Sequence, residues 1–195
     1  MSDFIHSPGI GLSDFDFRLQ QRVLMLGHAP VVAVAQTIAR NVNMTNSGLL
    51  SSGRETMALV YIPQGQAVNG VIWRSGSTAA VAPTNQWAAI RDIGKKLLAV
   101  TADLTNTAWA ATAIQTFTFA TPFVAPYSGL YYVSVMVAAG TVPTLFGTST
   151  DTNLNTVVPI TSGFDPAGGL TTPATAPATA GALSPVGTIP YAYLF

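Results

Sequence analysis

The stretch IQTFTFATPFVAPYSGLYYVSVMVAA, residues 114–139, decides the fold class of this chain. In its first part Phe117 and Phe119 alternate with threonines, which is the period of a strand with one buried face. Two prolines and a glycine between residues 122 and 129 then mark a corner. The apolar run at 130–139 follows, rich in valine and tyrosine. The pattern predicts two strands joined by a corner.

Short β-prone runs separated by turn residues continue on both sides of this stretch. They are MALVYI (57–62), GVIWR (70–74), TAAVA (78–82), QWAAIRD (86–92), KLLAVTA (96–102), TAWAATA (107–113), TVPTLFG (141–147) and IPYAYLF (189–195). A spacing of roughly ten residues between short strands predicts a sandwich or a barrel rather than βαβ units. We therefore expect one all-β domain over residues 56–195.

Residues 148–188 interrupt this pattern with a segment rich in Thr, Ala, Pro and Gly. An excursion of this length with little regular structure is unusual inside a compact domain. We expect either disorder or a long loop or arm that neighbouring subunits hold. The aromatic residues of the final run predict that the chain is tied down again at 189–195.

Residues 1–55 differ in composition and are expected to form an N-terminal docking arm. Ser13 and Asp16 predict the start of a short helix, and Gly27 predicts its end. A helix this short needs something to pack against. The segment 31–40 is compatible with either a strand or a helix. The apolar docking candidates of the arm are Phe15, Phe17, Leu19, Val23 and Leu26.

Charge is scarce: 8% of the residues are charged, against about 25% in a typical soluble domain. A chain with so few charges is expected to hide much of its surface against partners. The longest apolar stretch, 129–140, is far shorter than the ~20 residues of a membrane-spanning helix. The first residues, MSDFIHSPG, lack the pattern of a signal peptide. We expect neither membrane insertion nor export.

The titratable residues are too few and too scattered to predict an enzyme. The chain has a single glutamate, two histidines and no cysteine, with zero formal net charge. No catalytic motif occurs, and neither histidine has a second ligand at metal spacing. The segment Asp151–Thr156 departs from a calcium loop at its sixth position, where threonine replaces glycine. We expect no catalytic site, no cofactor, no metal and no nucleic-acid partner.

The tryptophans leave two interpretations open. Trp73, Trp87 and Trp109 lie in or beside predicted strands. Exposed tryptophans stack on sugar rings, so these three are candidate glycan contacts. Tryptophans also fill the cores of β-sandwiches, which is the interpretation we favour.

The run Phe119–Val135, FATPFVAPYSGLYYVSV, resembles a motif of the trimeric jelly rolls of the C1q and tumour-necrosis-factor type. In these proteins an extended segment with proline precedes a Ser-Gly corner and a strand with paired aromatics. The resemblance implies a jelly-roll β-sandwich that assembles as a homotrimer. The aromatic candidates for its core or its trimer interface are Tyr131, Tyr132, Tyr191, Tyr193 and Phe195. The segment 148–188 is longer than a compact jelly roll needs.

Residues 70–147 are also similar to modules in structural proteins of tailed bacteriophages. The stretches that carry this similarity are GVIWRSGSTAAVAPTNQWAAIRD, KLLAVTADLTNTAWAAT and SGLYYVSVMVAAGTVPTLFG. The similarity implies a virion protein that is made in the host cytoplasm and bound to other virion proteins. We expect a tail-associated or fibre-type subunit, with a host surface glycan as a further partner. The alternatives are a capsid decoration or head-fibre protein and a carbohydrate-binding module.

Overall fold

The computed structural model describes residues 34–39, 42–48, 50–151, 156–165 and 174–195. Within these residues the regular structure consists of β-strands joined by turns and loops, so the all-β prediction is confirmed. The strands are β1 (Ala35–Gln36), β2 (Thr45–Ser47), β3 (Arg54–Ile62), β4 (Ala67–Arg74), β5 (Val81–Arg91), β6 (Leu97–Val100), β7 (Ile114–Val124), β8 (Gly129–Thr141), β9 (Leu145–Ser149), β10 (Ser162–Phe164), β11 (Ser184–Pro185), β12 (Thr188–Pro190) and β13 (Ala192–Leu194).

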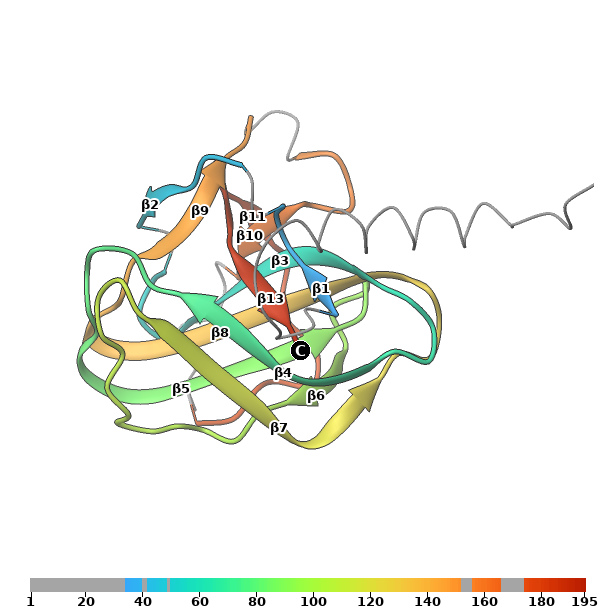
Figure 1. Cartoon of the computed structure of the whole chain (residues 1–195), viewed down its shortest axis with the longest axis horizontal. Helices are drawn as coiled ribbons and strands as arrows, with labels where there is room; N and C mark the ends of the chain where they lie inside the picture. Colours follow the sequence, from blue (N-terminus) through green and yellow to red (C-terminus); the bar gives the residue numbers. More distant parts are fainter. Residues whose placement is uncertain (1–33, 40–41, 49, 152–155, 166–173) are drawn as a thin grey trace, which may run out of the picture. The chain divides into compact units, whose positions relative to one another are not determined.

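The two main sheets have the connectivity of a jelly roll (Figure 1). One sheet has the order β1-β13-β4-β7, and the other has the order β11-β10-β3-β8-β5-β6. Without the short strands β2 and β9–β12, eight strands remain. Counted along the chain, the first of these eight pairs with the last, the second with the seventh, the third with the sixth and the fourth with the fifth. These pairs are β1 with β13, β3 with β8, β4 with β7 and β5 with β6, all antiparallel. Such nested pairing results when one long hairpin is rolled into two sheets.

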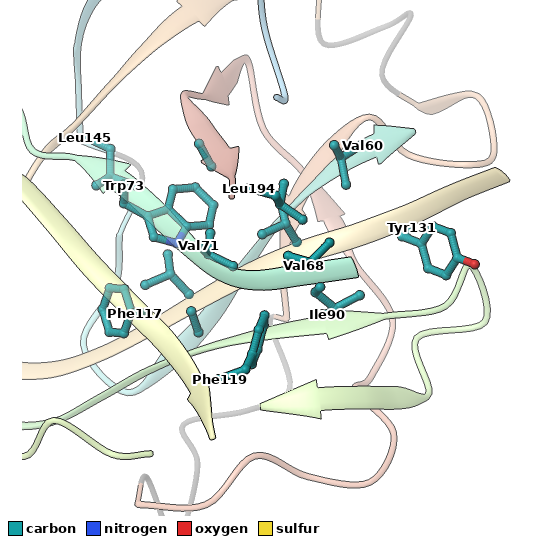
Figure 2. Packing of buried hydrophobic residues seen from close by; sticks show 14 of the residues in the cluster. Val60, Val68, Val71, Trp73, Ile90, Phe117, Phe119, Tyr131, Leu145 and Leu194 are labelled. Carbon is teal, nitrogen blue, oxygen red and sulfur yellow. The ribbon is translucent and has the colours of Figure 1, made fainter. Parts of the chain in front are cut away.

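The core lies between these two sheets and follows from the alternation of their strands. Val71 and Phe117 from one sheet and Val133 and Ile90 from the other belong to one cluster of buried side chains (Figure 2). Val71 lies opposite Phe117 in the β4–β7 register, and Val133 lies opposite Ile90 in the β5–β8 register. Successive side chains of a strand point to opposite faces, so these pairs define the inner face of each sheet.

Three predicted strands differ from the structure. The runs 78–82 and 86–92 were expected as separate strands with a break at Pro83. Instead, the single strand β5 continues through Pro83 and contains residues 81–82 of the first run and residues 86–91 of the second. Pro83 is tolerated because a register shift follows it and because β6 pairs only with the far end of β5, residues 89–91. Residues 107–113 were expected to form a strand and instead form a loop.

The described parts of the expected arm and of the long excursion belong to the β structure. Val34–Phe195 forms one compact unit, so this unit begins before residue 56, and β1 and β2 are paired within it. In the segment 148–188, β10 pairs with β3, and β12 joins β9 and β2 in a small third sheet. The helix expected near Ser13–Gly27 and its docking candidates Phe15, Phe17, Leu19, Val23 and Leu26 lie outside the described residues.

Candidate interaction surfaces

The outer face of the sheet that contains β3, β8 and β5 is covered by the chain itself. Residues 174–183, here called the strap, lie over this face. Ala176 packs against a cluster built on Trp87 and Met136. Ala180 and Leu183 pack against a second cluster that contains Met57 and Tyr132. A sheet face that would otherwise bind a partner is therefore used for packing within the subunit.

The strap is also hydrogen-bonded to the edge of this sheet. The Leu97 N–H donates to the Ala178 carbonyl at 2.8 Å, and the Ala180 N–H donates to the Lys95 carbonyl at 3.2 Å. Asp165 fixes the strap at a second point, because its Oδ2 accepts the Gly181 N–H at 2.7 Å. The Asp165 N–H in turn donates to the Glu55 carbonyl at 3.1 Å. Hydrogen bonds therefore hold the strap to β6 and its preceding turn directly, and to the start of β3 through Asp165.

A buried ion pair lies beneath the strap. Arg91 Nε donates to Glu55 Oε1 at 2.7 Å, and Nη2 donates to Oε2 at 2.9 Å. The side chains are 0% and 2% exposed. Arg91 Nη1 donates to the carbonyls of Lys95 at 3.1 Å and Pro177 at 3.0 Å, so the guanidinium joins β5, the β5–β6 turn and the strap. Both charges are paired and hydrogen-bonded, and these interactions offset the free-energy cost of removing the two side chains from water.

The outer face of the sheet β1-β13-β4-β7 is distinguished by its lack of charge. One row of this face runs across all four strands in register, from Gln36 through Tyr193 and Ile72 to Thr116. The four strands together contain one charged residue, Arg74, whose guanidinium lies 4.9 Å from the ring centre of Phe146. This face is therefore almost free of charge.

The tyrosine candidates separate into buried and half-buried groups. Tyr131 and Tyr132 are buried within the subunit, Tyr131 between the sheets and Tyr132 under the strap. Tyr191 is buried too, with its ring centre 6.2 Å from that of Tyr193. Tyr193 and Phe195 are half-buried. Of the five aromatic candidates, these last two are the ones that keep partial exposure to solvent.

Burial raises the pKa of both core tyrosines. For Tyr131 the main cause is desolvation of the phenol by burial. Its hydroxyl donates to the Tyr127 carbonyl at 2.8 Å. For Tyr132 desolvation alone raises the pKa. The Tyr132 hydroxyl donates to the Ile160 carbonyl at 3.0 Å, and this bond fixes the segment before β10 against β8. Both hydroxyls therefore act as structural donors in their neutral form.

The glycan contacts suggested for the tryptophans are wrong. Trp73, Trp87 and Trp109 are 0%, 1% and 1% exposed. Trp73 and Trp109 belong to the core between the sheets, and Trp87 packs on the outer face of its sheet with Met136. The Trp109 ring meets the Phe117 ring edge to face at 5.8 Å. Indole rings that are enclosed in this way cannot stack on a sugar.

The described residues contain no group of three or more His, Asp or Glu side chains that could hold a metal ion. In that same part of the chain, no helix has the length and apolar character to cross a bilayer.

The feature that sequence reasoning missed is the Glu55–Arg91 pair. Its only sequence signal was that Glu55 is the single glutamate and Arg91 interrupts an apolar strand.

A scan against models of protein families finds no match for this chain, and a search of curated proteins finds no relative.

Proposed function

We propose that this chain is a structural subunit of a bacteriophage particle, tail-associated or fibre-type, that assembles as a homotrimer. The observation that carries the proposal is the contrast between its two sheets. Within the described residues, the chain's own strap packs on two apolar clusters of one outer face, whereas the strands of the other sheet carry a single charged residue and the half-buried Tyr193. A structural subunit needs a stable unit with one face reserved for association.

The energetics support association through this face. Apolar surface that leaves water contributes about 25 cal/mol per Å². Tyr193 and Phe195 are half-buried in the single subunit, and the four strands contain no acidic side chain that would be desolvated with them. Three copies around an axis form a closed assembly, which can attach to a particle without polymerising. The host surface is proposed as a partner of the assembled particle.

The test is the mass of the purified full-length chain in solution, measured by light scattering. We expect a multiple of three subunits for the wild-type chain and a loss of the three-fold association for Tyr193→Lys. Tyr61→Lys is the matched control, because Tyr61 is exposed on the other sheet. If the three-fold assembly persists in Tyr193→Lys, the interface lies on another surface of the subunit. A wild-type chain that is monomeric at all concentrations would overturn the trimer.

A capsid decoration or head-fibre protein is the alternative within the same structural class. The same charge-poor face would serve it, so copy number decides between the two. Quantitative mass spectrometry of purified particles would give few copies for a tail component and many for a protein that decorates the capsid lattice. The burial of all three tryptophans removes the support for a carbohydrate-binding module.

A further inference from the structure

One sheet edge of the described structure is long and unprotected, and it belongs to β7. This strand is the last in the order β1-β13-β4-β7 and is paired with β4 on one side only. It extends over Ile114–Val124 and contains no charged residue. Soluble proteins usually shorten, charge or cover such edges, because unpaired N–H and C=O groups are a template for another strand. In β7 the protection is limited to Pro122, near its end.

The other edges of the sheets in the described residues are treated differently. The edge at β6 is bonded to the strap through Leu97 and Ala178. The edge strands β1 and β11 have two residues each, and β2 and β12, at the edges of the small sheet, have three each. The chain therefore covers or shortens every described edge except that of β7.

The direction of the backbone groups on β7 follows from its pairing. The Ser75 N–H donates to the Ala113 carbonyl at 2.9 Å, immediately before β7. Hydrogen-bonded pairs alternate in an antiparallel ladder, so Gln115 and Phe117 direct their backbone groups toward β4. The backbone groups of Ile114, Thr116 and Thr118 point to the free edge. The side chains of these three residues are exposed as well.

We infer that the free edge of β7 pairs antiparallel with the same edge of a second copy of this chain, joining two four-stranded sheets into one. A second copy offers just one free edge of matching length among the described residues, which is β7 itself. The edge is also self-complementary. A two-fold axis near Thr116 and Thr118 sets threonine against threonine, a favourable cross-strand pair, and brings no like charges together.

This two-fold contact is separate from the three-fold association proposed above, and the two can be tested together. The assay is light scattering on the full-length chain over a range of concentrations. The edge variants are Thr118→Lys and Thr118→Glu, which place like charges across the two-fold axis. The matched control is Thr141→Lys, because Thr141 is an exposed threonine on β8 that is paired with Val81.

We expect an even number of chains in the wild-type assembly, a halved mass for each edge variant and no change for the control. Mixing the Lys and Glu variants should restore the wild-type mass. A wild-type dimer that the edge substitutions convert to a monomer supports the edge contact and overturns the trimer. A wild-type hexamer that they convert to a trimer supports both the edge contact and the three-fold association. A trimer that Thr118→Lys leaves unchanged overturns the edge contact alone, and a wild-type monomer overturns both.

Hydrogen exchange tests the same contact without any substitution. Amides at a free edge exchange quickly, whereas amides in a ladder are protected. We expect the amides of Ile114, Thr116 and Thr118 to be protected in the assembled protein and to lose this protection in Thr118→Lys. Rapid exchange at these three amides in the wild-type assembly would overturn the inference.

Discussion

Replacement of Arg91 by methionine would show how much the ion pair under the strap contributes to stability. The substitution keeps an unbranched side chain but removes both bonds to Glu55 and both bonds to the carbonyls of Lys95 and Pro177. Glu55 would then be a buried carboxylate without its cation. Breaking a buried pair in this way costs about 3–5 kcal/mol. Since about 1 kcal/mol shifts the melting temperature by roughly 2–4 °C at this chain length, we expect a decrease of roughly 6–20 °C.

The assay is urea denaturation together with thermal melting, and limited proteolysis reports whether the strap is released. Lys96→Met is the matched control, because Lys96 is an exposed cation in the same turn and should change stability by less than about 0.5 kcal/mol. The double variant Arg91→Met with Glu55→Leu should recover much of the loss, because no unpaired charge remains. A loss below about 1 kcal/mol for Arg91→Met alone would refute the reasoning.

Two further substitutions test other contacts of the fold. Gly70→Ala should destabilise the protein by about 1–3 kcal/mol in thermal melts. The new Cβ would lie 2.7 Å from Phe195 Cζ and even closer to the Phe117 carbonyl oxygen. Unchanged stability would contradict this packing. The raised pKa of Tyr132 means that the folded state holds the phenolic proton more tightly than the unfolded state. The contribution of this group to the free energy of unfolding is therefore complete below pH 10 and is lost as the pH rises. Tyr132→Phe should cost about 0.5–1.5 kcal/mol at neutral pH and make the alkaline decline in the free energy of unfolding shallower; equal slopes for both proteins would refute it.

The strands predicted from sequence are those in which alternation and β-branching agree. Phe117 and Phe119 on β7 face the core as their spacing from the threonines indicated. The loop at 107–113 was mistaken for a strand because Thr107, Trp109 and Thr112 give it a β-prone composition. That residue is instead an anchor, whose carbonyl accepts the Ala80 N–H at 2.9 Å. A single large side chain cannot show whether it is buried by a strand or by a loop.

The strap could not be predicted, because its signal depends on what lies beneath it. Ala176, Ala180 and Leu183 are small or isolated apolar residues in a segment whose composition resembles that of a linker. Their role appears only when Trp87 and Met57 are known to face outward from a sheet. The same holds for Glu55 and Arg91, which lie 36 residues apart and meet only through the registers of β3, β8 and β5.

The position of β13 has a consequence for the speed of folding. This strand lies between β1 and β4, and its Leu194 is paired with Ala35 on one side and Val71 on the other. The segments that meet here are separated by most of the chain, so a large loop must close before the sheet is complete. Folding rates decrease as contacts become more distant in sequence. We expect the pairing of β5 with β6 and with β8 to form early, and the insertion of β13 to be among the slowest steps.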